Sequence, residues 1–163
     1  MSKETNLEIA RLIANAYSTG DFEPLFPLMT DNYEHHSYWV WDPMAGKETV
    51  IPYYRGKGNA LKKSPFKVKT ELVRITKPEL NLDPAELLYV NGEKMEPGTR
   101  ITVRSEMDSI CVLMHQTLDD GTENSILAVP TINEQGQLTQ LLITNPDLFS
   151  LERIQEREDA KGV

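Results

Sequence analysis

The sequence is short of three things: cysteine, long apolar runs and positive charge. Cys111 is the only cysteine in 163 residues, so an intramolecular disulfide is excluded, which suits a reducing compartment. No apolar run approaches the roughly 18 residues of a transmembrane helix, and no apolar segment typical of a secretory signal follows Met1. We therefore expect a cytoplasmic protein without a membrane partner.

Basic residues are outnumbered by acidic ones, 17 against 25, and the net charge is −8. A field of that sign repels a phosphate backbone, so we expect no nucleic-acid partner. The basic clusters, such as Lys62-Lys63, are short and interleaved with apolar residues, a pattern typical of solvated faces.

The ordinary proportions of apolar (39%) and charged (26%) residues indicate a folded globular chain. The length predicts a single domain over residues 1–163. A domain of this size buries roughly 70% of the surface of its unfolded chain, so it needs no disulfide or metal to fold.

The first third of the chain has helical periodicity interrupted by one strand. Residues 5–18 carry a single apolar stripe, and Gly20 is placed to end that helix. A short second helix follows Asp21. Residues 33–41 are rich in aromatic and β-preferring side chains and predict a strand, and residues 46–63 predict a third helix.

From Ser64 the period of the apolar residues becomes two, which predicts a strand. The apolar set shifts to the other parity after Leu72, and this shift predicts a β-bulge there. Residues 77–99 contain three prolines and the turn dipeptide Asn91-Gly92, which indicates a surface excursion with a small hairpin.

Three long strands are predicted next, over residues 100–118, 122–132 and 137–144, joined by turns rich in Asp, Asn and Gly. The charged segment 146–163 predicts a C-terminal helix over 148–157 and a frayed end. Helices followed by a run of antiparallel strands indicate an α+β fold.

The stretch AYSTGDFEPLFPLMTDNYEHHSYWVWDPMAGKETVIPYYRGKG resembles the first half of the nuclear transport factor 2-like superfamily, closest to its polyketide-cyclase-like (SnoaL-like) branch. The resembling features are the helix ending at Gly20-Asp21, the short second helix, and the paired aromatics Tyr53-Tyr54. The resemblance implies a cone-shaped fold, in which a curved, mostly antiparallel sheet wraps about three helices from the N-terminal half around a pocket. It also implies a homodimer formed through the sheet.

The resemblance does not imply one reaction, because the superfamily includes isomerases, cyclases, hydrolases and non-catalytic members. In its ketosteroid isomerases the first strand carries a catalytic carboxylate, and Ser37 stands at that position here. A neutral hydroxyl cannot remove a proton from carbon without a base of its own. Ile13 stands where those isomerases have a tyrosine. Isomerase chemistry is therefore disfavoured.

Alternation along the first strand places Tyr33, His35, Ser37, Trp39 and Trp41 on one face. Apolar walls with few polar groups are typical of small-molecule pockets. The alternative is that these aromatic side chains are simply core. With Tyr17 and Tyr54 from the helices, the predicted ligand-binding residues are Tyr17, Ser37, Trp39, Trp41 and Tyr54.

The histidines give two further candidates. His35 and His36 are adjacent on a strand and point to opposite faces, so they cannot chelate one ion, and we expect neither a metal nor a cofactor. His115 lies on a strand that is apolar on both faces. It is either a hydrogen-bonded core histidine or, if it faces His35, a second acid/base. Cys111 reads as a small buried hydrophobe.

The sequence thus predicts a protein that binds a small apolar organic ligand, with His35 and His115 as the catalytic residues if it is an enzyme. The alternatives are a ligand sensor without turnover and a non-catalytic dimer that works by protein association.

Overall fold

The computed structural model describes residues 3–37, 44–64, 67–76, 89–90, 93–94, 110–118 and 120–154. The predicted site residues Trp39 and Trp41 lie outside these ranges. Within them, no helix is long and apolar enough to cross a membrane. The elements are α1 (Lys3–Thr19), the 3-10 helix η1 (Glu23–Leu28), β1 (Met29–Ser37), β2 (Met44–Ala45), α2 (Lys47–Lys63), β3 (Lys69–Ile75), β4 (Tyr89–Val90), β5 (Glu93–Lys94), β6 (Ile110–Thr117), β7 (Glu123–Ile132), β8 (Leu138–Thr144), the 3-10 helix η3 (Pro146–Leu148) and β9 (Leu151–Arg153).

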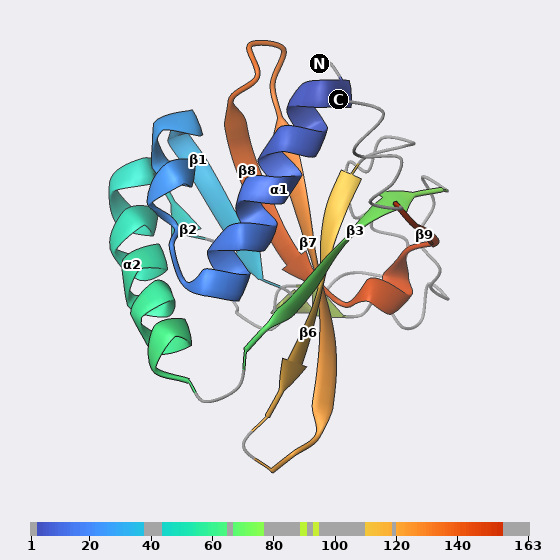
Figure 1. The fold of residues 1–163 in the computed structure, drawn as a ribbon. Coiled ribbons are helices and arrows are strands. Elements are labelled where there is room, and N and C mark those ends of the chain that lie inside the picture. Colours follow the sequence, from blue (N-terminus) through green and yellow to red (C-terminus); the bar gives the residue numbers. More distant parts are fainter. Residues whose placement is uncertain are drawn as a thin grey trace.

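Seven strands form one sheet in the order β2-β1-β8-β7-β6-β3-β9, and β4 pairs with β5 alone. All neighbours are antiparallel except β1 and β8, which run parallel. The helices α1 and α2 lie on one face of this sheet, and α2 runs beside β1 (Figure 1). The predicted α+β class, with a curved, unclosed and mostly antiparallel sheet and its helices in the N-terminal half, is confirmed.

The main core lies between the helices and the sheet. The apolar stripe of α1 supplies Ile9, Ile13 and Ala16, each 2% exposed or less, and they pack on Val112 and Met114 of β6 within one cluster. This is the face that positions the candidate site, because the inward side chains of β1 join the same cluster.

A second, smaller apolar cluster covers the other face of the sheet. It consists of Val73, Ile75, Cys111, Leu127, Val129, Leu142 and Phe149. The alternation of apolar residues changes after Leu72 because, from there on, the buried apolar side chains of β3 lie on the other face of the sheet. The predicted bulge is wrong, because β3 and β6 pair without a break from Lys69 to Arg74.

The predicted C-terminal helix over 148–157 is also wrong. Residues 151–153 form β9, which pairs antiparallel with β3. The backbone N–H of Thr76 donates to the carbonyl of Ser150 (2.9 Å), and that of Ile154 donates to the carbonyl of Leu72 (3.0 Å). Pairing with the edge of β3 satisfies backbone groups of both strands, and this outweighs the helical propensity of a charged tail.

The hairpin predictions are confirmed. Gly121 and Gly136 adopt positive φ values of 85° and 79°, where glycine is favoured, in the turns between β6, β7 and β8. The small hairpin predicted around 91–92 is present as the pair β4–β5.

Two glycines set the distance between α1 and α2. Gly20 has a φ of 84° after the last turn of α1, and a Cβ on it would lie 2.5 Å from the carbonyl oxygen of Gly58. A Cβ on Gly58 would in turn collide with the carbonyl oxygen of Gly20. The glycine at position 58, inside a helix, is thus explained by a close approach of two backbones.

This contact gives a matched pair of substitutions on one helix. Gly58→Ala should destabilise the protein by about 2 kcal/mol, because overpacking against backbone outweighs the gain in helix propensity. Gly56→Ala should instead stabilise it by about 0.5–1 kcal/mol, since nothing lies within 4 Å of the added Cβ. Urea unfolding of both variants measures the difference. Equal effects of the two substitutions would contradict the close approach.

Candidate functional site

The inward face of β1 meets α2 at a cluster of aromatic side chains. In the pairing with β8, His35 lies opposite Leu141 and Ser37 opposite Ile143, two residues of the main core. Tyr33 is fully buried and His35 is 3% exposed. The predicted alternation of β1 is therefore confirmed for the described residues, and Tyr33, His35 and Ser37 share the face that looks toward the helices.

Tyr54 of α2 links two of these side chains. Its hydroxyl lies 2.6 Å from the hydroxyl of Tyr33 and 2.6 Å from Nδ1 of His35. The Tyr54 side chain is itself fully buried. These contacts form a short buried chain of hydrogen bonds from Tyr33 through Tyr54 to His35.

The direction of this chain follows from which proton each direction leaves unpaired. If His35 Nδ1 donated to Tyr54, then Tyr54 would donate to Tyr33, and the Tyr33 proton would find no acceptor among the described residues. In the opposite direction Tyr33 donates to Tyr54 and Tyr54 donates to Nδ1, and the proton without a partner among the described residues is the one on Nε2 of His35. We assign this second direction because an imidazole nitrogen accepts more strongly than a phenol oxygen, and because Tyr33, whose proton the first direction would leave unpaired, is completely buried.

The imidazole is neutral at neutral pH. Burial, and secondarily the electrostatic influence of Lys57 and His36, lower the pKa of His35 to about 4. Burial likewise raises the pKa of the Tyr54 and Tyr33 hydroxyls. The chain of hydrogen bonds therefore carries no charge.

Tyr17 approaches the same cluster from α1. Its ring packs edge-on against Phe22 at 5.0 Å between centroids, and Phe22 stacks on Tyr54 at 5.1 Å. The Tyr17 side chain is 2% exposed, yet its hydroxyl has no hydrogen-bond partner in the described part of the chain. Burial, with smaller contributions from Tyr33 and Tyr53, raises the pKa of this phenol well above its ordinary value.

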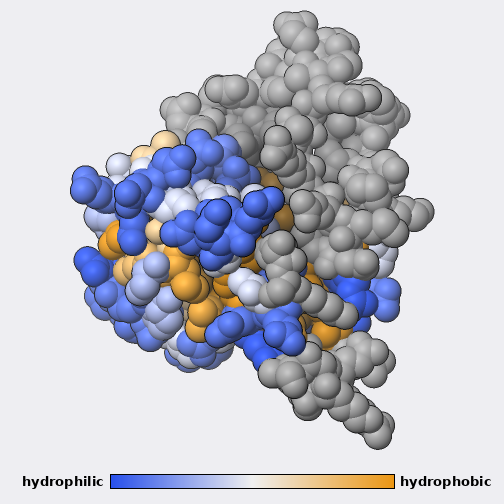
Figure 2. Space-filling model, turned by 90° about the horizontal axis from the view of Figure 1, so that it is seen from above, coloured by the Kyte–Doolittle hydropathy of each residue, from blue (hydrophilic) through white to orange (hydrophobic). Residues whose placement is uncertain are grey.

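The outer rim of the cluster is formed by two residues of α2. Tyr53 is 38% exposed and lies against His35, with ring centroids 5.2 Å apart. Lys57, one turn later, is half-buried, and its Nζ lies 5.8 Å from the Tyr17 ring centroid. Seen from above, apolar surface gathers between hydrophilic surface on the side where α2 and β1 lie (Figure 2).

The structure places His115 away from this cluster. It pairs with Ser125 on the sheet face that carries Leu127, opposite to the face of His35. The two histidines therefore do not face one another, so the condition under which His115 would be a second acid/base is not met. The alternation of β6 alone cannot tell which of two apolar faces carries the helices.

On that face His115 sits in a row of polar side chains from four strands. Its Nδ1 lies 2.9 Å from Ser125 Oγ and its Nε2 lies 3.1 Å from Glu71 Oε1. Arg153 Nε lies 3.0 Å from the other oxygen of Glu71. The order of serine, imidazole and carboxylate is that of a hydrolytic triad, but the strand amides around it are engaged in the sheet and cannot form an oxyanion hole.

Three further features belong to the search for a site. Cys111 is buried and burial raises the pKa of its thiol to about 12, which confirms its prediction as an inert hydrophobe. Among the residues of known placement, no group of three or more metal-ligating side chains comes together.

A groove lies at the C-terminal end of α2. Its volume of about 190 Å³ is smaller than that of most ligand pockets. It is lined by Leu61, Ser64, Lys67, Val68, Gln116, Thr117 and Leu118.

Of the predicted ligand-binding residues, the structure brings Tyr17, Ser37 and Tyr54 to the helix side of the sheet. Phe22 and Lys57 were missed by the sequence analysis. The spacing of Lys57, four residues after Tyr53 and three after Tyr54, is the signal that places it on the same side of α2 as these residues. No such signal exists for Phe22, because its position depends on how the chain turns after Gly20.

Comparison with known proteins identifies the fold. No protein-family model and no curated protein matches the sequence. Among solved structures, an NTF2-like protein of unknown function from Mesorhizobium loti is 9% identical, with a TM-score of 0.55 and coverage of 86% of this chain and 90% of that one. An NTF2-like protein of unknown function from Cytophaga hutchinsonii is 14% identical, with a TM-score of 0.51 and coverage of 87% and 97%.

A SnoaL-like protein of unknown function from Burkholderia thailandensis is 12% identical, with a TM-score of 0.49 and coverage of 91% and 97%. At these identities the likenesses concern the fold alone. The fold of this chain is nuclear transport factor 2-like, as the resemblance predicted.

Proposed function

We propose that this nuclear transport factor 2-like fold holds a small organic molecule between its helices and its sheet, at Tyr17, His35 and Tyr54. The observation that carries the proposal is the Tyr17 hydroxyl, buried without a partner in the described part of the chain. A buried hydroxyl that makes no hydrogen bond costs about 1–3 kcal/mol. A ligand that accepts from it would remove this cost.

The direction of the hydrogen-bond chain supports the same proposal. The Tyr54 hydroxyl donates a hydrogen bond to Nδ1 of His35, so the imidazole can donate only through Nε2–H. No partner for Nε2–H lies among the described residues. Two unpaired donors beside the partly exposed ring of Tyr53 suit a ligand with an apolar body and a hydrogen-bond acceptor.

The geometry favours binding over proton transfer. A general base works best when its pKa is near the operating pH, and the pKa of His35 is lowered to about 4. Its neutral imidazole is therefore a weak base but a good donor. Acid/base catalysis by His35, and any catalytic role of His115, remain predictions without support from this arrangement.

The homodimer through the sheet also remains a prediction. The apolar residues of the outer face are buried within the single chain, Leu127 and Cys111 completely. The more exposed side chains of that face, such as Ser125, are polar. A dimer formed there would rest on polar contacts, and this is why we place ligand binding first.

Tyr17→Phe tests the proposal, because it removes only the unpaired hydroxyl. We expect the free protein to be as stable as the wild type or more stable by about 1 kcal/mol. The ligand-induced rise in melting temperature should be smaller in the variant. The measurement is a thermal melt against a library of polyketide, steroid and aromatic compounds.

The matched control is Tyr33→Phe, which removes a paired hydroxyl from the same cluster. It should lower the stability of the free protein and leave the ligand-induced shift unchanged. A library without a single hit, or hits whose shifts are equal in Tyr17→Phe and the wild type, would overturn the proposed site.

A further inference from the structure

Lys57 is the least expected residue in the cluster. It is half-buried, and burial lowers the pKa of its ammonium group. Its nearest aromatic partner is the Tyr17 ring, and no carboxylate lies within ion-pair distance among the residues whose placement is described. A partly buried cation without a counter-ion is costly, since desolvation is not repaid by an opposite charge.

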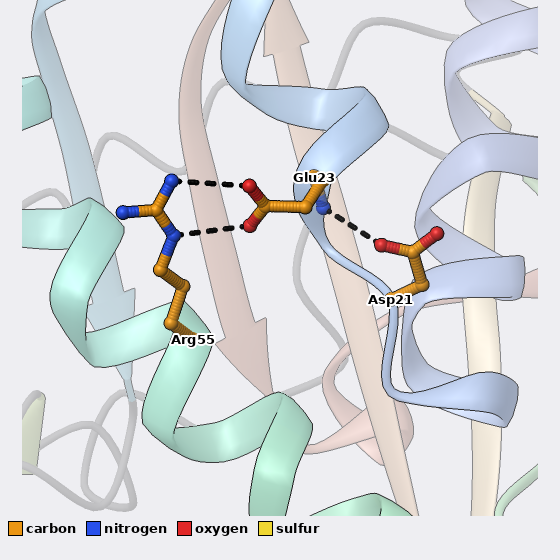
Figure 3. Close-up of polar contacts among 3 residues, drawn as sticks. All are labelled: Asp21, Glu23 and Arg55. Atoms are coloured by element: carbon orange, nitrogen blue, oxygen red, sulfur yellow. Dashed lines mark hydrogen bonds and ion pairs between the residues drawn. The ribbon is translucent and has the colours of Figure 1, made fainter.

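Arg55, two residues earlier on α2, shows the opposite arrangement. Its guanidinium is exposed and forms a bidentate pair with Glu23, with Nε and Nη2 at 3.1 and 3.0 Å from the two carboxylate oxygens (Figure 3). The Asp21 carboxylate in turn accepts from the backbone N–H of Glu23 at 3.2 Å. The exposed cation of this helix is thus paired, while the more buried one is not.

The other titratable groups of this cluster bring no negative charge. They are the neutral imidazole of His35 and the protonated phenols of Tyr17, Tyr33, Tyr53 and Tyr54. The chain has a net charge of −8. The cluster around Lys57 nevertheless carries a positive charge together with other hydrogen-bond donors. Tyr17 Oη, His35 Nε2 and Lys57 Nζ all donate.

We propose that the ligand of this site is an organic anion, an aromatic or apolar carboxylate. Its charge would lie against Lys57 and accept from Tyr17 and His35, and its apolar body would lie against the ring of Tyr53. This inference rests on the proposed ligand-binding function and adds the charge of the ligand. Three donors without an acceptor favour an anion over a neutral molecule, which would leave the ammonium uncompensated.

Matched acid and amide probes test the charge alone. We choose 2-naphthoate and 2-naphthamide, which share one apolar body, and measure their dissociation constants by calorimetry at pH 7. The wild type should bind the acid at least about tenfold more tightly than the amide, the usual worth of a hydrogen bond to a charged group. Lys57→Met should abolish that preference, so that the acid and the amide bind equally, while Lys57→Arg retains it.

Lys63→Met is the control, because it removes an exposed lysine from the end of the same helix. It should keep the preference for the acid. The proposal of an anionic ligand would be contradicted if the wild type bound acid and amide equally, or if Lys57→Met and Lys63→Met lost the preference for the acid equally. Neither result would contradict the ligand site itself. Binding of neither probe, with no neutral hit in the library, would overturn the site itself.

Discussion

Tyr54→Phe is expected to lower the free energy of unfolding by about 3 kcal/mol, the largest loss from any single hydroxyl of this cluster. The substitution keeps the ring, which stacks on Phe22, and removes only an oxygen. That oxygen is shared by two buried groups, Tyr33 Oη and His35 Nδ1, each at 2.6 Å. Each group left without its partner costs about 1–3 kcal/mol. Urea unfolding at pH 7 measures the loss.

Two neighbouring tyrosines are the controls for this substitution. Tyr33→Phe removes the first donor of the chain and leaves Tyr54 bonded to His35, so about 1 kcal/mol should be lost. Tyr53→Phe removes a hydroxyl from a side chain that is 38% exposed, and its effect should be close to zero. Losses of the same size in Tyr54→Phe and Tyr33→Phe would show that Tyr54 does not hold both partners.

Acid should destabilise this protein through His35. The pKa of its imidazole is about 4 in the folded chain, against an ordinary value of 6.5. Between these values the unfolded chain binds a proton that the native chain does not, so the stability falls as the pH falls. The contribution is fully present above pH 6.5 and is lost by about pH 4. The gap between the two pKa values corresponds to about 3 kcal/mol.

His35→Gln isolates this contribution, because glutamine does not titrate and its amide oxygen can accept from Tyr54. The variant should be less stable than the wild type at pH 7, and the difference between them should shrink by about 3 kcal/mol between pH 7 and pH 4. His36→Gln is the control on the opposite face of β1 and should retain the dependence that His35 causes. A stability difference between His35→Gln and the wild type that is constant over this range would contradict the neutral, buried imidazole.

Local patterns predicted the fold well where periodicity and turn residues agree. The stripe of α1, the alternation of β1, and the turns at Gly121 and Gly136 all depend on neighbours in the sequence. The strand β9 could not be predicted in this way, because its partner is the edge of β3, about 80 residues away in the chain. Its charged sequence favours a helix in isolation, and only the tertiary partner reverses that preference.

The candidate site, like the fold, could be predicted where it depends on local patterns in the sequence. Alternation gave His35 and Ser37 a common face, and helical spacing brought Tyr54 toward them. The side of the sheet on which His115 lies depends on which apolar face the helices cover, and β6 is apolar on both. Nothing in the sequence indicates that the Tyr17 hydroxyl would find no partner among the described residues while Tyr33 and Tyr54 are bonded.

The pairing of β1 with β8 also determines when this protein can fold. The N-terminal helices rest on strands from the other end of the chain, and Asn6 of α1 exchanges two hydrogen bonds with the backbone of Ile110, 104 residues later. Contacts between distant parts of a chain form slowly. During synthesis the apolar side of α1 cannot complete its packing until β6 has left the ribosome. Chaperones that bind nascent chains should therefore hold this protein until its last strands appear.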